Sequence, residues 1–392
     1  MPLFILLLLA LSPLALLAAS PQVESSPQAE STVASRPEAA CSRIPDKAGR
    51  AGMAAVPLPA ADDRSMPVVM MTGGANFPYA KPGATTPAER GQKVFYDEVL
   101  VMTPPSSCAS CGSAPVQAGR LPYPIGYAAF APSDKGMVVA GGCNMGGHLA
   151  CVTRVQLCNG RVLTEALPDL PVSLAYPAFA VLDGQLYVMG GQEKPDSTVC
   201  LNRCFVLNLR DTDAGWKETA PLPGEGRMLA AAGVLNGQIY VAGGCSLHPD
   251  SKGQAERTYL KSILRYDPAT SRWSEAGELP ETLVGAANPM PAWEGSLYLI
   301  CGDPGNYYRA SLAGKAPAVH PGQNRTVYSL TVDRNASPDR KTNLSCRRAG
   351  ENPVGIATAP AVSVGNTVYV ISGETHPGIR TPLISTFTLN AQ

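Results

Sequence analysis

The sequence predicts an all-β chain folded as a six-bladed β-propeller, and three observations support this prediction. One phrase recurs six times: two apolar stretches with a polar turn between them, closed by a glycine doublet or its remnant. The recurrences lie roughly 50 to 70 residues apart, the period of four-stranded blades with loop insertions. The apolar periodicity of helical repeats is absent. The phrases read PVVMMTGG (ending at Gly74), KGMVVAGG (Gly142), DGQLYVMGG (Gly191), NGQIYVAGG (Gly244), GSLYLICGD (Asp303) and GNTVYVISGE (Glu374).

Residues 1–20 precede the predicted fold and have the pattern of a signal peptide. The run MPLFILLLLALSPLALLAAS is apolar and ends in small residues, as a secretory h-region and its cleavage site do. No Lys or Arg precedes it, so an uncleaved membrane anchor is the alternative. We expect a periplasmic or secreted protein without stable membrane insertion.

Residues 21–40 are predicted to form a disordered linker. They consist mainly of Pro, Ser, Ala and Glu and show no apolar periodicity, so they cannot bury enough surface to offset the entropy of ordering. The propeller is therefore expected over residues 41–392.

Each repeated phrase is predicted to be a β-hairpin. Asn236-Gly237 and Asp183-Gly184 supply the positive φ angles of a tight turn between two strands. A third strand such as SILRYDPAT and a fourth such as RWSEAGELP would complete a blade. We expect Trp216 and Trp273 to pack between neighbouring blades.

The last blade lacks a fourth strand of its own. After GNTVYVISGE the chain offers one more strand, TPLISTFTLN. We therefore expect the segment that begins near Cys41, CSRIPDKAG, to supply the outer strand of the last blade. This pairing would close the ring and remove exposed sheet edges.

The composition excludes some classes of function and predicts disulfides. Lys plus Arg and Asp plus Glu number 31 each, so no net positive field favours nucleic acid. Eleven cysteines behind an export signal indicate an oxidising compartment and several disulfides, with one cysteine left over. Cys108 and Cys111 have the spacing of a zinc or redox pair, but no second pair follows, so structural disulfides are favoured.

Two glycine doublets are interrupted by acids, and these acids are the first candidates for chemistry. Gly302-Asp303 and Gly373-Glu374 stand where the connection from the second to the third strand begins, at one mouth of a propeller channel. Arg380 follows Glu374 across the loop GETHPGIRT, which contains Pro377 and Gly378. A turn of that length can bring the carboxylate and the guanidinium together.

The blades resemble Kelch repeats, and two motifs resemble one family. GETHPGIRT is similar to the corresponding loop of the sialic acid mutarotases, also called N-acetylneuraminate epimerases. GGANFP and RGQKVFYDEVLVM in the first blade resemble the insertion-bearing blade of that family. First and last blades are neighbours on a closed ring, so the order of these motifs resembles a cyclically permuted member.

The resemblance implies an isomerase that interconverts α and β anomers of N-acetylneuraminate, by acid/base-assisted ring opening and reclosure. It implies that Glu374 is the acid/base and that Arg380 anchors the sugar carboxylate. No metal or other cofactor is expected, and a homodimer is left open. The residues expected to hold the glycerol and acetamido groups are Asn76, Lys93, Tyr96, Asp303 and Arg309.

Other interpretations stay open at this stage. A non-enzymatic Kelch propeller could bind a protein or a glycan through its loops. A copper oxidase is disfavoured, because the sequence has only four histidines. His376 is interpreted as a surface loop residue and Arg227 as a structural arginine between blades. The sequons at Asn324, Asn335 and Asn343 accept glycans only in a eukaryotic source.

Overall fold

The structure is a computed structural model of the chain. All its described residues belong to the larger of two compact units, Thr32–Gln392. The predicted signal peptide and linker, Cys41 and the Cys108/Cys111 pair lie outside the described residues. In the part of the chain that is described, no helix has the length and apolar character to cross a membrane. The described residues are 42–58, 67–80, 87–104, 113–317, 319–332 and 344–389.

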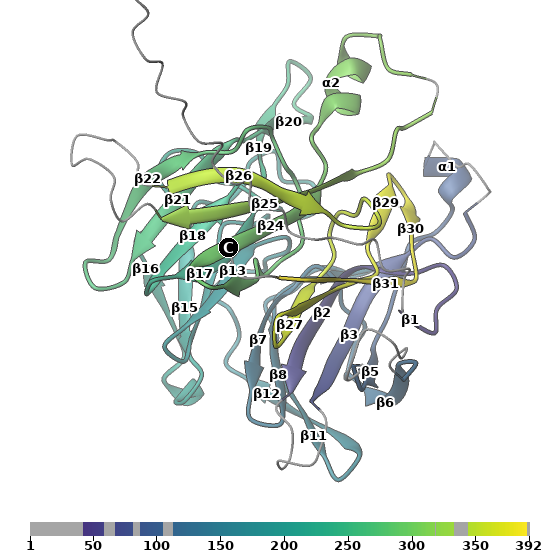
Figure 1. Cartoon of the computed structure of the whole chain (residues 1–392), viewed down its shortest axis with the longest axis vertical. Helices are drawn as coiled ribbons and strands as arrows, with labels where there is room; N and C mark the ends of the chain where they lie inside the picture. Colours follow the sequence, from purple (N-terminus) through teal and green to yellow (C-terminus); the bar gives the residue numbers. More distant parts are fainter. Residues whose placement is uncertain are drawn as a thin grey trace, which may run out of the picture. The chain divides into compact units, whose positions relative to one another are not determined.

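The first three blades are antiparallel sheets that follow one another along the chain (Figure 1). From the inner to the outer strand, the first consists of β2 (Ala51–Leu58), β3 (Val68–Asn76), β5 (Glu98–Met102) and β6 (Val116–Arg120), with β4 (Val94–Phe95) paired to β3. The second consists of β7 (Ala129–Ser133), β8 (Gly136–Ala140), β11 (Val152–Cys158) and β12 (Arg161–Leu167), and the third of β13 (Ala178–Leu182), β14 (Gln185–Met189), β15 (Cys204–Asn208) and β16 (Trp216–Thr219), with the short helix η1 (Thr212–Ala214) before β16.

The other three blades repeat this order and confirm the six-bladed prediction. The fourth consists of β17 (Ala231–Leu235), β18 (Gln238–Ala242), β21 (Ser262–Asp267) and β22 (Arg272–Glu278), and the fifth of β23 (Ala292–Trp293), β24 (Ser296–Gly302), β25 (Asn324–Val332) and β26 (Leu344–Glu351). The sixth consists of β27 (Ala361–Val364), β28 (Thr367–Ile371), β31 (Leu383–Thr388) and β1 (Ser42–Arg43).

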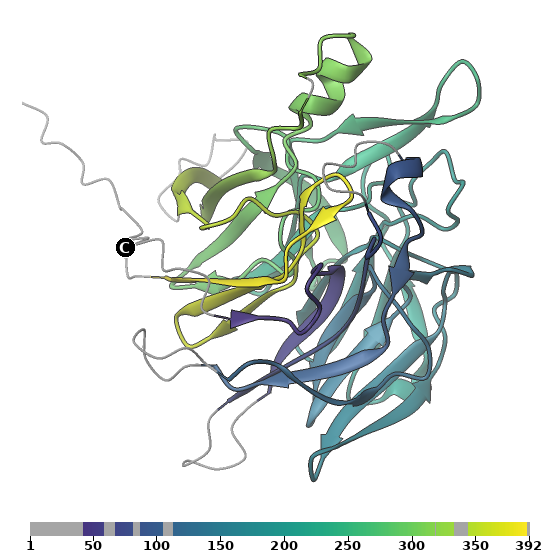
Figure 2. The same cartoon turned by 90° about the vertical axis from the view of Figure 1, so that its right-hand side faces the viewer.

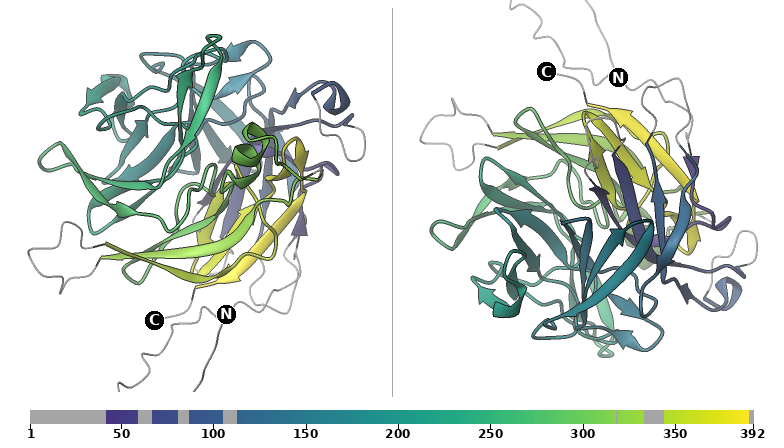
Figure 3. Two further views of the ribbon diagram at one scale, coloured as in Figure 1. Left: turned by 90° about the horizontal axis from the view of Figure 1, so that it is seen from above. Right: turned by 90° about the horizontal axis from the view of Figure 1, so that it is seen from below.

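An N-terminal strand completes the last blade, as predicted. β1 pairs with β31 in the register Ser42↔Ile384 and Arg43↔Leu383. Arg50 adds a second link between the first and last blades, because its carbonyl accepts a hydrogen bond of 2.7 Å from the amide of Gly373. Figure 3 shows the first blade in purple beside the last in yellow from both sides. The sheet of the last blade is thus closed by strands from opposite parts of the sequence.

The blades pack against one another through aromatic side chains. The rings of Phe130 and Phe179 lie 4.5 Å apart, between the second and third blades. The indole N–H of Trp216 donates to the carbonyl of Pro168 at 3.0 Å, and that of Trp273 donates to Ala220 at 2.8 Å. Each acceptor lies in the connection that follows the preceding blade, which confirms the predicted packing of both tryptophans between blades.

A closed ring of backbone hydrogen bonds surrounds the channel and fixes its centre. One residue in or next to each connection between blades has a positive φ, from 55° to 68°, and its N–H donates to the matching carbonyl of the preceding blade. Only a closed arrangement of six blades allows this circular pattern. The donors and acceptors are Gly52 to Thr358 (2.7 Å), Tyr127 to Gly52 (2.8 Å), Tyr176 to Tyr127 (3.0 Å), Leu229 to Tyr176 (2.9 Å), Gly285 to Leu229 (2.8 Å) and Thr358 to Gly285 (2.6 Å).

The insertions of the propeller occupy one face, which we call the loop face (Figure 2). Within the described residues, the added hairpins and the two α-helices lie in connections from the second to the third strand of a blade. In the second to sixth blades the connections from first to second strands are two-residue turns, such as Asn236-Gly237 with φ angles of 51° and 71°. The insertions are the hairpins β9–β10 (Cys143–Asn144, Gly147–His148), β19–β20 (Cys245–Pro249, Ala255–Tyr259) and β29–β30 (Glu374–His376, Ile379–Arg380) and the helices α1 (Pro87–Arg90) and α2 (Asn306–Leu312).

The predicted disulfides are not confirmed. All the cysteines among the described residues are free thiols, because none is joined to another. Burial raises the pKa of several, including Cys204 and Cys301, to about 12, so these thiols stay protonated and pack as small apolar groups. The prediction rested on cysteine number and a presumed export, and neither places two sulfur atoms at bonding distance. The free cysteines are Cys143, Cys151, Cys158, Cys200, Cys204, Cys245, Cys301 and Cys346.

Candidate active site at the channel mouth

A cavity of about 420 Å³ opens on the loop face at the centre of the propeller. Four residues of the hydrogen-bonded ring line the cavity, and the ring therefore lies at its base. These are Tyr127, Tyr176, Leu229 and Thr358. This volume lies in the range of small-molecule sites. The cavity is lined by Tyr127, Tyr176, Gln192, Pro195, Met228, Leu229, Leu247, Ala255, Arg257, Thr358 and Glu374.

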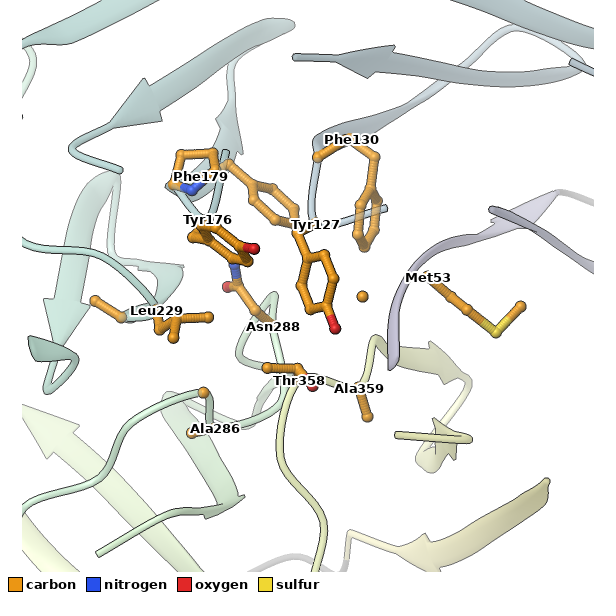
Figure 4. A pocket seen from close by; sticks show the side chains of 15 residues that line it. Met53, Tyr127, Phe130, Tyr176, Phe179, Leu229, Ala286, Asn288, Thr358 and Ala359 are labelled. Carbon is orange, nitrogen blue, oxygen red and sulfur yellow. The ribbon is translucent and has the colours of Figure 1, made fainter. Parts of the chain in front are cut away.

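A second cavity, of about 60 Å³, touches the same ring and is largely apolar. In Figure 4 the side chains of Tyr127, Tyr176, Phe130 and Phe179 gather on one side of it, with Thr358 and Ala359 opposite. Tyr127 and Tyr176 line both cavities. The two tyrosines thus connect the polar mouth to the apolar interior of the channel.

Glu374 and Arg380 meet at the edge of the larger cavity. They are directly opposed in the β29–β30 hairpin, and the guanidinium Nη2 lies 2.8 Å from the carboxylate Oε2. Glu374 also forms a backbone bridge to Ala357, with both N–H···O distances at 2.8 Å. The side chain of Glu374 is 23% exposed and that of Arg380 is 4% exposed. The carboxylate therefore faces the cavity, and the guanidinium lies behind it.

Arg380 is held in a buried position. Its Nη2 also donates to the hydroxyl of Tyr127 at 3.4 Å, and the guanidinium lies 4.8 Å from the ring centroid of Phe77. Its Nε and Nη1 are buried and have no hydrogen-bond partner among the described residues. Burial alone would lower the pKa of Arg380, but Glu374 and Tyr127 outweigh it and raise the pKa above its ordinary value. The geometry favours a role in holding Glu374 and Tyr127, and anchorage of a sugar carboxylate by Arg380 stays a prediction.

Tyr127 and Tyr176 are site residues that the sequence interpretation missed. Both have the positive φ angles of the ring, 58° and 60°, and their ring centroids are 4.9 Å apart. Burial, with the charges of Cys143 and Tyr127, raises the pKa of Tyr176 well above 10, so its phenol remains protonated. The repeated phrases GYAAF and AYPAF were the available signal, because they place a tyrosine at the same distance before two of the hairpins.

Lys93 is the predicted residue of the first blade that reaches the site. Its Nζ lies 4.5 Å from the ring centroid of Tyr127 and 5.0 Å from that of Phe95. The side chain is half-buried. Lys93 thus brings a positive charge beside the two tyrosines of the mouth.

Asn76 and Tyr96 do not line the cavity. The Asn76 amide donates at 2.8 Å to the carboxylate of Asp46 and to the carbonyl of Gly49, and accepts at 2.9 Å from Tyr96. Arg50 stacks on the Tyr96 ring, 3.7 Å from its centroid. Their internal partners lie in the segment that joins the last blade to the first, so both side chains contribute to the closure of the ring.

Asp303 and Arg309 also have internal partners. Asp303 accepts hydrogen bonds of 2.8 Å from the hydroxyl of Tyr259 and from the amide of Gly305. Arg309 is exposed and bonds to Asn306 in its own helix and to the carbonyl of Pro304. Neither side chain lines the cavity.

His376 and Arg227 lie where the sequence suggests. His376 packs edge-on against His320 at 5.8 Å, in a loop at the surface of the last blade. Arg227 is buried and donates to the carbonyls of Gly243 and Ser262. Arg227 is therefore structural. Within the described ranges, no cluster of three or more His, Cys, Asp or Glu side chains is placed to hold a metal ion.

Fold and site together define a six-bladed Kelch-type propeller with an acid–arginine pair at the mouth of its channel. Comparison with known families agrees with the predicted resemblance: the family model of N-acetylneuraminate epimerase matches residues 167–325. The central part of this chain is thus similar to the N-acetylneuraminate epimerases. The match ends before the loop that contains Glu374 and Arg380, so that pair is a separate observation.

Individual relatives show the same relationship. The chain is 27% identical over 194 residues to N-acetylneuraminate epimerase of Haemophilus influenzae (strain PittEE), which covers 46% of this chain and 50% of the relative. It is 26% identical over 196 residues to that of Yersinia pestis (strain Pestoides F), covering 46% and 48%. Kelch-like protein 23 of Mus musculus is 47% identical over 68 residues, 17% of this chain and 11% of the relative. The chain spans about half the length of the curated epimerases that it matches.

Proposed function

We propose that this chain is an N-acetylneuraminate epimerase that interconverts the α and β anomers of sialic acid. One observation carries the proposal: the Glu374 carboxylate faces a cavity of sugar size and is fixed by Arg380 at 2.8 Å. The similarity of the central blades to named epimerases supports the choice of sugar.

The proposed reaction needs two proton transfers. Glu374 takes the proton of the anomeric hydroxyl, whose oxygen becomes a carbonyl as the bond from the anomeric carbon to the ring oxygen breaks. The ring oxygen takes a proton from a phenol, for which Tyr127 is placed. Ring closure on the other face of the carbonyl reverses both transfers and gives the second anomer. Positioned acid/base groups of this kind contribute rate factors of about 10² to 10⁴.

Arg380 supports both groups from behind in this scheme. Its Nη2 reaches the carboxylate of Glu374 and the hydroxyl of Tyr127. A fixed cation beside the phenol stabilises the phenolate that forms when the proton leaves. Arg380 thus acts as a positioning and electrostatic residue.

Export belongs to the same proposal. The apolar segment over residues 1–20 supports a periplasmic or secreted location, where the enzyme would meet free sialic acid outside the cytoplasm. An epitope-tagged full-length chain should be found in the periplasmic or culture fraction of its host. Retention with the membrane fraction would favour the uncleaved anchor.

Proton NMR of single-anomer N-acetylneuraminate tests the reaction directly. Crystalline sugar is dissolved, and its approach to anomeric equilibrium is followed with and without the protein. We expect the protein to accelerate the exchange in proportion to its concentration. An unchanged rate would reject the epimerase and favour the alternative of a Kelch propeller that binds a protein or glycan through its loop face.

A further inference from the structure

The channel mouth holds more positive charge than its own carboxylate neutralises. Glu374 is paired with Arg380. Lys93 lies beside Tyr127, and Arg257 lines the same cavity. Across the described residues, neither Lys93 nor Arg257 forms an ion pair with a carboxylate. A cavity with this excess of cations suits an anionic ligand.

Arg257 is the better placed of these two cations. It lies on β20, opposite Leu247 in the β19–β20 hairpin, and its side chain is exposed where the hairpin overhangs the cavity. Its guanidinium interacts with the phenol of Tyr259, an uncharged group two residues along the same strand. Arg380, by contrast, is 4% exposed and already bound to Glu374. Arg257 can therefore offer a planar pair of N–H donors to a ligand without breaking an ion pair.

Three residues from the fifth blade hold the strand that carries Arg257. The Arg257 N–H donates to the hydroxyl of Tyr308 at 3.2 Å. The hydroxyl of Tyr259 donates to Asp303 at 2.8 Å, and the Arg309 guanidinium lies 5.7 Å from the Tyr259 ring centroid. We call Asp303, Tyr308 and Arg309 the β20 clamp. It gives Asp303 and Arg309 a function without direct contact with the cavity.

We infer that Arg257 binds the carboxylate of an acidic sugar in this cavity, and that the β20 clamp positions it. The inference rests on the proposed function for the identity of the sugar, and on the geometry of the mouth for the charge. A guanidinium can donate two parallel hydrogen bonds to one carboxylate, which fixes the orientation of the ligand as well as its affinity. In this arrangement the anomeric centre beside the carboxylate lies toward Glu374.

Isothermal titration calorimetry on the full chain tests the inference with two ligands that differ in one charge. N-acetylneuraminate carries the carboxylate, and its methyl ester does not. We expect the wild type to prefer the acid. Arg257→Gln should weaken binding of the acid roughly 10- to 100-fold and leave binding of the ester within about twofold. Arg257→Lys should fall between the wild type and Arg257→Gln, because it keeps the charge and loses the paired donors.

A matched control and a positioning variant complete the design. Arg265→Gln removes the same charge from β21 of the same blade, where Arg265 bonds to Ser274, and should leave both affinities unchanged. Tyr308→Phe removes the acceptor of the Arg257 N–H and should weaken binding of the acid only a few-fold. Equal melting temperatures across the series would show that the losses are not due to unfolding.

The outcomes separate this inference from the proposed function. Three results would overturn the role of Arg257. The affinities for acid and ester could fall equally in Arg257→Gln and Arg257→Lys, or neither affinity could fall. The third result is that the wild type binds neither ligand. A wild type that prefers the acid through Arg257, yet does not accelerate anomer exchange, would keep the inference and reject the epimerase. If the wild type accelerates anomer exchange and Arg257→Gln binds the acid with unchanged affinity, the epimerase is kept and the role of Arg257 is rejected.

Discussion

The two ends of the channel are built on the same six blades and differ in their chemistry. At the loop face the cavity wall includes Glu374, Arg257 and Tyr127. At the other end a cavity of about 300 Å³ is lined almost entirely by apolar residues, such as Val181 and Val234. Connections from second to third strands, at the loop face, carry hairpins and the helices α1 and α2, whereas the first and second strands of the second to sixth blades are joined at the other end by two-residue turns. Functional side chains are thus concentrated where the repeat tolerates insertion.

The largest expected effect is that of Glu374→Gln, which removes the carboxylate from the loop-face end. The amide keeps the size of the side chain and cannot accept the anomeric proton at neutral pH. We expect anomer exchange above the uncatalysed rate to fall at least about 100-fold, as measured by proton NMR.

A matched control for this variant exists on the third blade. Glu218 is paired with Arg203 at 2.7 Å on the outer strand β16, and Glu218→Gln should leave the exchange rate unchanged. Equal exchange in Glu374→Gln and the wild type would remove Glu374 from the mechanism.

Arg380→Met is expected to show how much the buried ion pair at the mouth contributes to stability, compared with an exposed pair. It leaves the partly buried Glu374 carboxylate without its partner, and should lower the free energy of unfolding by about 1–3 kcal/mol in urea titrations. Arg203→Met breaks an exposed ion pair and should lower the free energy of unfolding by less than about 1 kcal/mol.

The same substitution can be made on top of Glu374→Gln. In that background Arg380→Met should lower the free energy of unfolding by a measurably smaller amount, because no carboxylate is left without its partner. An identical loss in both backgrounds would mean that packing, and not the ion pair, accounts for the effect.

The repeat and its closure could be predicted from the sequence, because both follow from local patterns. Turn residues such as Asn236-Gly237 fix the hairpins, and a missing fourth strand in the last blade requires a donor, which is β1. The contact between Glu374 and Arg380 follows in the same way, since they face each other across one hairpin. The hairpins and the acid–arginine contact use only neighbours in the sequence, and the closure follows from counting the strands of the last blade.

The rest of the site depends on contacts between blades, which local patterns do not encode. Tyr127 and Tyr176 reach the mouth because the ring imposes positive φ on them, a conformation that tyrosine seldom adopts. Arg257 is held over the cavity by residues some 50 positions away. For the same reason Asp303, which follows a broken doublet just as Glu374 does, turned out to bind Tyr259 instead of facing the cavity.

A smaller effect is expected from His148, which binds the loop-face hairpin β9–β10 to the third blade. Its Nδ1 lies 2.9 Å from the carbonyl of Gln192, and burial lowers its pKa below 6.5. The unfolded chain binds a proton near pH 6.5 and the folded chain only at lower pH. This contribution to stability is therefore present above pH 6.5 and lost as the pH falls below it. His148→Gln should flatten the fall of the melting temperature between pH 7 and 5. A curve unchanged by this substitution would contradict the assignment.

The smallest effect is expected at the apolar end, where the comparison is most easily broken. Val181 lines that cavity and is half-buried, so Val181→Thr adds one hydroxyl at nearly constant volume. If the ring separates the two ends, anomer exchange and the affinity for N-acetylneuraminate should stay within about twofold of the wild type, because no polar group of the mouth is disturbed. NMR exchange and calorimetry measure both quantities on one preparation. A loss of rate comparable to that of Glu374→Gln would place the chemistry in the apolar channel, and the polar cavity at the loop face would then be only a route of access.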